Sequence, residues 1–379
     1  MFSFFERLID PYRAVPLSPP PAGLWAFFWH YIRPVWPIAA GIGLLSALIA
    51  GLEMVMLNYV GNFVDLMAHA NRATFFTDHG RELLGIGALV LVVLPVLAIA
   101  WEFLSHQSFA GNFPMMIRWQ AHRYILRQSL TYFQDDFAGR LATTVMQTAL
   151  AVRDSLNAMI NTIVYAVVYV FTALAVLATA DWRLAIPLAI WVMAYGLTAW
   201  YFMPKLSQRS EAQADARSVM TGRVIDSYTN IMAVKLFAHT AVEDRYARDS
   251  MNTFLETVHG QMRLVTKLNV CLRIMNYMLM AVTVLVSILL WRAELVSVGP
   301  IAVAVALALR LDALSDWVLW QVAGLFESIG VVRDGLKTLT KPVAIVDVPG
   351  AQPLAVSQGA ITFDNVVFHY GQEIGRAHV

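Results

Sequence analysis

The chain alternates long apolar runs with polar segments of very unequal length. A membrane-spanning helix needs about 20 mostly apolar residues, and six runs meet this requirement: 35–59, 83–104, 156–180, 184–203, 270–291 and 296–320. The connections 105–155 and 205–267 are long and polar, whereas 181–183 and 292–295 are very short. Both long connections therefore fall on one side of the membrane. The pattern predicts an all-α membrane protein with six transmembrane helices and long helical extensions on that side.

The segment 205–267 is expected to form two helical arms joined by an apolar bend. Residues 207–228 are rich in good helix formers, a break follows at Thr229 and Asn230, and helical sequence resumes near Thr240. At 1.5 Å of rise per residue, arms of about 20 to 25 residues reach roughly 30 to 37 Å. Apolar residues in the bend 230–237 would face water, which indicates docking to a partner. A soluble hairpin with a buried turn is the alternative.

Composition agrees with a membrane location. Hydrophobic residues make up 58% of the chain and charged residues 14%, against about 25% charged residues in soluble domains. The net charge of +1 does not favour nucleic acid as a partner. The single cysteine, Cys271, excludes an intrachain disulfide, and the histidines lack metal-ligand spacing. We therefore expect neither a metal site nor catalytic residues in this chain.

The basic residues predict the orientation. Lys and Arg gather in 105–155 and 205–267, as well as near both ends of the chain. The positive-inside rule therefore places the long loops and both termini in the cytoplasm. Within the N-terminal segment 1–34, aromatic residues such as Trp25 and Trp29 predict a helix lying at the membrane interface. The transmembrane domain proper is expected to cover 35–341.

Two short phrases carry a resemblance to a known family. Phe-Ala-Gly-Arg-Leu at 137–141 and Asn-Ile-Met-Ala-Val-Lys-Leu-Phe-Ala-His at 230–239 resemble the two cytoplasmic coupling loops of the ABC exporter transmembrane domain. The resemblance extends over about residues 20–373. It implies the type 1 exporter fold, an elbow helix within 1–34, and a dimer with a second half-transporter, identical or related. It also implies that the loop tips dock onto ATP-binding domains through Phe137, Gly139, Arg140, Asn230, Val234, Lys235 and Phe237.

The C-terminal part resembles the beginning of an ATP-binding domain. A linker is expected at 342–359, and the alternating segment 360–373 is typical of a strand. The resemblance implies that this is the first strand of a truncated nucleotide-binding domain and that Tyr370 stacks on adenine. Residues 374–379 depart from the family pattern and are interpreted as a non-native tail. Since no GxxxxGK[ST] loop is present, we expect no ATP hydrolysis by this fragment, while the full-length parent uses ATP and Mg²⁺.

Charged residues inside the apolar runs mark a candidate substrate cavity. Arg310, Asp312 and Asp316 lie in the sixth run beside Trp317, and Glu53 lies in the first run. Ionisable side chains at bilayer depth are costly and are functional candidates by default. Asp312 and Asp316 share one helical face, whereas Arg310 needs a partner on another helix. A polar network between helices without ligand contact is the alternative for this cluster.

These observations predict the permease half of an ATP-driven ABC exporter. It would move an amphipathic or hydrophobic small molecule or lipid out of the cytoplasm by alternating access, in a bacterial inner membrane. An ion- or proton-coupled secondary transporter is the alternative, since intramembrane carboxylates can relay a coupling ion. Long loops with apolar tips favour the exporter.

Overall fold

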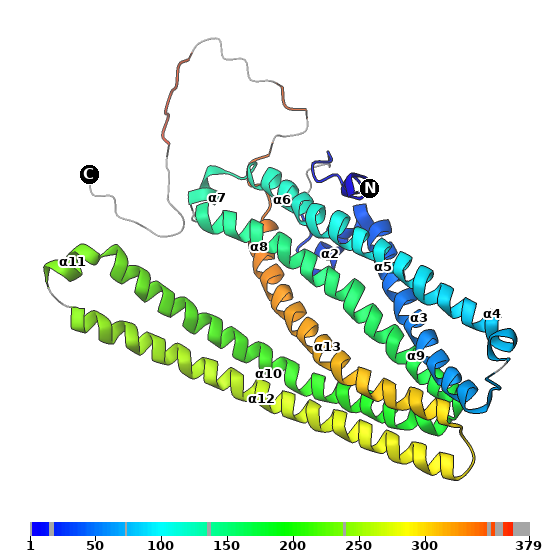
Figure 1. Cartoon of the computed structure of the whole chain (residues 1–379). Helices are drawn as coiled ribbons and strands as arrows, with labels where there is room; N and C mark the ends of the chain where they lie inside the picture. The colour runs from blue at the N-terminus through cyan, green and yellow to red at the C-terminus, as the bar shows by residue number, and fades with distance from the viewer. Residues whose placement is uncertain are drawn as a thin grey trace.

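A computed structural model describes residues 2–14, 19–72, 74–134, 138–237, 240–346, 350–352 and 359–366. All regular elements in these ranges are helical, and six helical stretches are long and apolar enough to cross a membrane. The predicted number of spans and the helical fold class are therefore confirmed. Figure 1 shows the long helices running roughly alongside one another, with the short helix α11 at the far end of the α10–α12 pair.

The six spans are built from the following elements. The first is α3 (Trp36–His69), preceded by α2 (Leu24–Ile32) and the 3-10 turn Arg33–Val35. The second joins α4 (Phe75–Ala88), the π-helix η2 (Leu89–Val93), α5 (Leu94–Glu102), the π-helix η3 (Phe103–Ala110) and α6 (Gly111–Ile125). The third joins α8 (Ala138–Asn157), the π-helix η4 (Ala158–Ile163) and α9 (Val164–Ala180). The last three are α10 (Trp182–Thr229), α12 (Thr240–Arg292) and α13 (Val298–Leu339).

The first connection differs from its predicted form. The apolar run was expected to end at Tyr59, but α3 continues to His69 and α4 begins at Phe75. The segment 60–82 is therefore mostly helix, not loop. Hydropathy locates the part of a helix that fits the bilayer, whereas the helix itself continues into water until a breaking signal or a tertiary contact ends it.

The two long connections form the helical extensions that the sequence predicts. In the second, α10 ends at Thr229, α11 (Ile231–Leu236) crosses the bend, and α12 begins at Thr240. The first contains α6, the short helix α7 (Leu130–Gln134) and the start of α8. Figure 1 shows α10 and α12 side by side over their whole length, diverging from α8 and α13 towards α11. The bend is thus carried on a two-helix arm that packs on itself.

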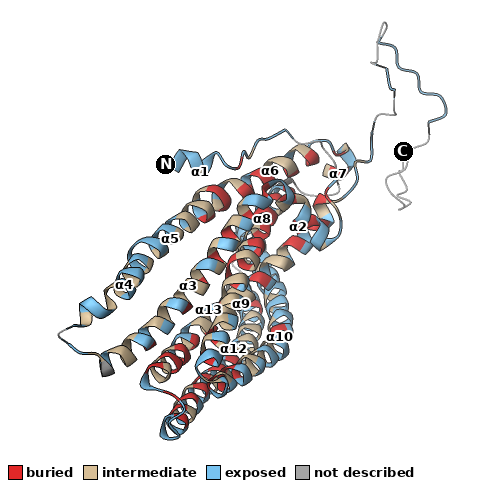
Figure 2. Cartoon of the chain, turned by 90° about the vertical axis from the view of Figure 1, so that its right-hand side faces the viewer, coloured by how far each residue is buried: buried red, intermediate tan, exposed pale blue. Residues whose placement is uncertain are grey.

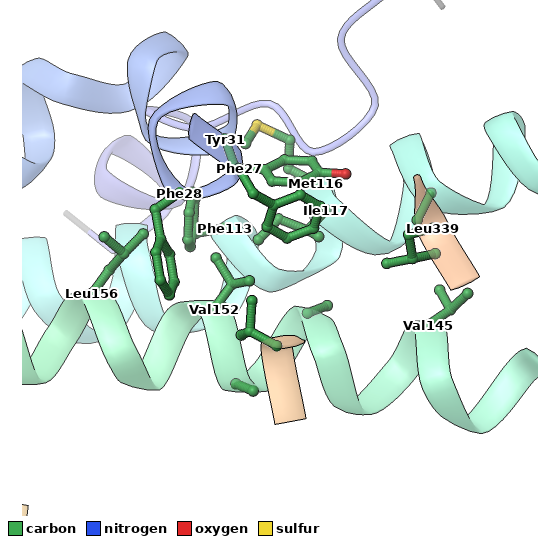
Figure 3. Close-up of a cluster of buried hydrophobic side chains, with 14 of the residues drawn as sticks. Phe27, Phe28, Tyr31, Phe113, Met116, Ile117, Val145, Val152, Leu156 and Leu339 are labelled. Atoms are coloured by element: carbon green, nitrogen blue, oxygen red, sulfur yellow. The ribbon is translucent and has the colours of Figure 1, made fainter. Parts of the chain in front are cut away.

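Clusters of buried apolar side chains hold the bundle together, and the two largest join most of its helices. One lies where α2 meets α6, α8 and the end of α13, and Figure 3 shows Phe27, Phe28 and Tyr31 of α2 inserted among them. On the opposite face of α2, Trp25 and Trp29 are exposed, so the helix is two-sided as an interfacial helix requires. The other cluster joins α3, α9, α10, α12 and α13.

The second span has an exposed apolar surface instead of a buried one. None of the residues in its most apolar 18-residue window is buried, and Figure 2 shows α4 and α5 largely in the exposed colour. Side chains such as Leu84 and Leu91 lie on this surface. Large apolar side chains in this position are suited to lipid or to another membrane helix.

Glycines bring α3 and α13 unusually close together. A Cβ added at Gly299 would lie 2.3 Å from the carbonyl oxygen of Gly61, and one added at Gly61 would lie 2.3 Å from Val303 Cγ2. Near the same point, Asp65 Oδ1 accepts a hydrogen bond of 2.7 Å from the backbone N–H of Gly299. Asp65 of α3 therefore caps the first turn of α13, which fixes the axial register of the two helices.

The expected C-terminal strand is not formed in the part of it that the structure describes. Residues 359–366 lie outside any helix or sheet. A strand needs neighbouring strands to satisfy its backbone hydrogen bonds, and a single one is not stable in water. The rest of the segment, including Tyr370, falls outside the described residues.

Candidate functional site

The Arg310 side chain finds its partner on the first membrane helix. Its Nη2 donates to Glu53 Oε2, and the Tyr165 hydroxyl of α9 donates to the same carboxylate oxygen over 2.7 Å. Arg310 also lies over the ring of Tyr169, 5.7 Å from its centroid. One carboxylate thus links α3, α9 and α13. The expectation that Arg310 pairs with another helix is confirmed.

A second charged cluster lies further along α13, where Asp312 and Asp316 follow Arg310 by two and six residues, about half a turn and 1.7 turns. Arg273 of α12 donates to Asp312 Oδ2 over 3.1 Å and to Asp316 Oδ2 over 3.2 Å. The two carboxylates on one helical face therefore share a single guanidinium. Asn276 extends this cluster, since its Nδ2 donates to Asp312 Oδ1 over 2.7 Å and to Ser315 Oγ over 3.0 Å.

Both clusters lie within the thickness of the bilayer. Arg310 is twelve residues from Val298, the first residue of α13, which corresponds to about 18 Å along the axis; the hydrocarbon layer is about 30 Å thick. Asp316, six residues further on, lies about 27 Å from Val298 and therefore near the opposite boundary of that layer. Arg310 is at mid-depth, too far from either surface for its side chain to extend into water along the helix.

These charged side chains are only partly covered by the chain. Arg310 is 44% exposed, Arg273 48% and Asp316 49%, whereas Glu53 is 23% exposed. Charged groups at this depth face a water-filled cavity or other protein and not lipid. The surface they form on α3, α12 and α13 therefore suits contact with water or with protein and not with lipid.

Aromatic rings lie beside the charges. Trp317 packs edge-on against Tyr165, with ring centroids 5.9 Å apart, and Tyr165 stacks on Tyr169 at the same centroid distance. Trp317 is 40% exposed. The structure thus brings together all five residues that the sequence assigned to a cavity, Glu53, Arg310, Asp312, Asp316 and Trp317, in two neighbouring clusters. Their contact with a substrate remains a prediction.

The bend of the long arm presents an apolar surface at its end. Met232, Leu236 and Phe237 are each at least 70% exposed. Asn230 ends α10 and begins α11, and its Nδ2 donates to the carbonyl of Asp226 over 3.0 Å. Val234 is half-buried and Lys235 is exposed. An apolar end this far from the bundle core is a surface for docking.

The first loop offers a smaller exposed tip. Gly139 and Arg140 open α8 and are exposed, so they lie where a docking partner can reach them. Phe137, the remaining residue predicted for this contact, falls outside the described residues. The α7 segment is anchored to the bundle, because the Tyr132 hydroxyl donates to the carbonyl of Thr338 over 3.2 Å.

Comparison with known proteins agrees with this architecture. Residues 40–311 match the family model of the ABC transporter transmembrane region. The chain belongs to this family. It is similar to a Haemophilus influenzae protein named "Uncharacterized ABC transporter ATP-binding protein", with 42% identity over 377 residues that cover 98% of the chain and 60% of the relative. It is also similar to "ABC multidrug transporter MDR5" of Trichophyton rubrum, with 24% identity over 165 residues, 42% of the chain and 13% of the relative.

The family match locates the ABC transmembrane region in this structure. It includes Glu53, both long loops and Arg310, and it ends before Asp312, Asp316 and Trp317. It begins after α2 and the whole N-terminal segment. The chain spans 60% of the length of the Haemophilus relative.

Several residues of the ABC transmembrane region that complete the polar clusters were not predicted. Tyr165 and Tyr169 lie in an apolar run in which aromatic residues are ordinary, so no sequence signal separates them from packing residues. Another network joins Ser46, Trp101 and Asn161, since the Ser46 hydroxyl donates to Asn161 Oδ1 over 2.7 Å and Trp101 Nε1 lies 2.9 Å from both oxygens. A polar residue within an apolar run was the available signal for Asn161.

Proposed function

We propose that this chain is the transmembrane half of an ATP-driven ABC exporter. The observation that carries the proposal is the pair of helical extensions, one of which ends in the exposed apolar helix α11. A membrane helix pair needs no arm of this length to cross the bilayer. An ATP-binding domain outside the membrane, in contrast, requires a rigid connection to the spans if its closure is to move them.

The assembled transporter would be a dimer of two such halves, identical or related. The charges on α3, α12 and α13 support this assignment, because they are partly exposed although paired, and lipid would leave their exposed part without solvation. A second half facing them would enclose a cavity that opens alternately to either side. The positive-inside distribution of Lys and Arg supports an inner-membrane orientation with the loops and both termini in the cytoplasm.

The substrate class follows from the lining. Aromatic surface from Trp317 and Tyr165 lies next to a small number of charged and polar groups. A cavity of mixed apolar and charged character suits an amphipathic or hydrophobic molecule, since its apolar part packs on the rings and its polar part replaces hydration with these contacts. The secondary-transporter alternative lacks support from the family match and leaves the long arm without a role.

Substitutions at the ends of the two long loops test whether these loops couple the chain to an ATP-binding domain. With the ATP-binding domain joined to or supplied beside this chain, Phe237→Ala should leave nucleotide binding intact and separate ATP hydrolysis from transport. Leu255→Ala, at an exposed position on α12 of the same arm but away from the bend, is the control and should behave as the parent. Unchanged transport in both Phe137→Ala and Phe237→Ala would contradict docking at these positions.

A further inference from the structure

The first residues of the chain are docked on the inner end of the second membrane helix. Residues 2–12, here called the N-terminal strap, include the short helix α1 (Phe2–Glu6). The rings of Phe2 and Phe5 both pack on Phe103 of η3, with centroid distances of 5.0 and 4.9 Å. Ile9 is 2% exposed and belongs to the core cluster around α2 and α6. The strap is thus packed as part of the fold.

Side chains of the second span also bind the strap backbone. The Ser108 hydroxyl donates to the carbonyl of Phe5 over 2.7 Å, and Asn112 Nδ2 donates to the carbonyl of Ile9 over 2.9 Å and to that of Glu6. Ser108 and Asn112 are four residues apart. The hydrogen-bonding side chains and the ring of Phe103 together form a site for this segment along η3 and the start of α6.

The docking site coincides with an unusual piece of helix. η3 (Phe103–Ala110) is π-helical over eight residues, whereas π-helices normally occur as single turns. Each π turn holds close to one residue more than an α turn. An eight-residue run therefore rotates the helix that follows it by roughly 0.4 of a turn relative to a continuous α-helix.

That rotation decides which face of α6 meets the core. Phe113, Met116 and Ile117 of α6 are buried, at α-helical spacing, against α8 and α2, as Figure 3 shows. Met115, on the other side of α6, is 38% exposed. If η3 became an ordinary α-helix, the apolar stripe of α6 would turn away from α8.

We propose that the N-terminal strap holds η3 in its π-helical form and so sets the rotational register of α6. α6 leads directly to α7 and the first loop tip, so the strap is a positioning element for that tip. It lies before residue 40, outside the part of the chain that matches the ABC transporter transmembrane region. The inference concerns this segment and does not depend on the substrate.

The test reads the register of α6 through two cysteines on opposite faces. In a Cys271→Ser background, Ile117→Cys is expected to react slowly with a maleimide and Met115→Cys to react readily. Removing residues 2–12, or introducing Phe5→Ala, should raise the reaction rate of the cysteine at 117 by about tenfold or more and lower that at 115. Phe4→Ala is the matched control, because Phe4 is exposed and its ring contact among the described residues is with Phe5.

The maleimide reaction rates at positions 115 and 117 together distinguish a rotation of α6 from a loss of its structure. Opposite changes at 115 and 117 support the proposal. A rise at 117 with an unchanged rate at 115 means local unfolding without rotation and overturns it, as does an absence of change at both positions. Far-ultraviolet circular dichroism of each variant, measured in the same lipid nanodiscs, shows whether the bundle as a whole is retained.

Discussion

Replacing Glu53 by alanine should destabilise the chain because it leaves Arg310 unpaired at mid-depth in the membrane. Breaking a fully buried ion pair by removing one partner costs about 3–5 kcal/mol, whereas an exposed pair contributes about 0–1 kcal/mol. Glu53 is 23% exposed and Arg310 44%, so the expected loss lies between these limits, at about 1–3 kcal/mol. The lost hydrogen bond from Tyr165 is part of this figure.

The ionic part of this effect is isolated by a double-mutant cycle. Arg310→Ala alone leaves Glu53 without its cation, and the double variant leaves neither charge. We expect the double variant to be more stable than the sum of the single effects predicts, with a coupling free energy of about 1 kcal/mol or more. Glu53→Gln, which keeps an acceptor for Tyr165, should lose less than Glu53→Ala.

The assay is thermal unfolding in lipid nanodiscs at a fixed scan rate, followed by tryptophan fluorescence. At about 2–4 °C per kcal/mol for a large domain, Glu53→Ala should unfold roughly 2–12 °C below the parent. Glu211→Ala, at an exposed position on the α10 arm, is the control and should unfold with the parent. Additive effects of Glu53→Ala and Arg310→Ala would contradict a stabilising ion pair between the two residues, because independent residues show no coupling.

Three further outcomes follow from the same structure. Gly299→Ala should destabilise the bundle by about 1–3 kcal/mol through overpacking. In the same unfolding assay Gly80→Ala should be neutral or stabilising, because its added Cβ meets nothing within 4 Å. Equal effects of the two substitutions would contradict the close approach of α3 and α13. Arg273→Ala should lower the unfolding temperature more than Arg273→Lys does, because lysine keeps a cation beside the two carboxylates it serves. In a Cys271→Ser background, a cysteine at Ala142 should be labelled in intact cells only after permeabilisation and one at Phe76 without it; the reverse pattern would overturn the orientation.

The spans and the long arm could be predicted from sequence because their signals are local. Apolar length defines a membrane helix, and the break at Thr229 and Asn230 is visible as a loss of helix-forming residues, so the structure places α11 where the bend was expected. The charges of the sixth span were identified for the same reason, since an ionisable residue is conspicuous in an apolar run.

Contacts between distant segments could not be predicted in this way. The pairing of Arg310 with Glu53 joins residues 257 positions apart, and nothing in either helix specifies the other. The docking of the N-terminal strap depends on Ser108 and Asn112, which look like ordinary polar residues of a loop. The strand predicted at 360–373 has a favourable local pattern, but no strand forms in its described part, since residues 359–366 lie outside any helix or sheet and a lone strand is not stable in water.

A measurement of what drives transport decides between an ATP-driven ABC exporter and an ion-coupled secondary transporter. Inside-out vesicles carrying the complete transporter, with this chain and an ATP-binding domain, would be incubated with a fluorescent amphipathic dye in the outer medium. An ATP-driven exporter should accumulate the dye only when hydrolysable ATP is present, and it should still do so when the proton gradient is collapsed. Accumulation should be lost in the Phe237→Ala variant. Accumulation driven by an imposed proton gradient without ATP, and unaffected by Phe237→Ala, would contradict an ATP-driven exporter.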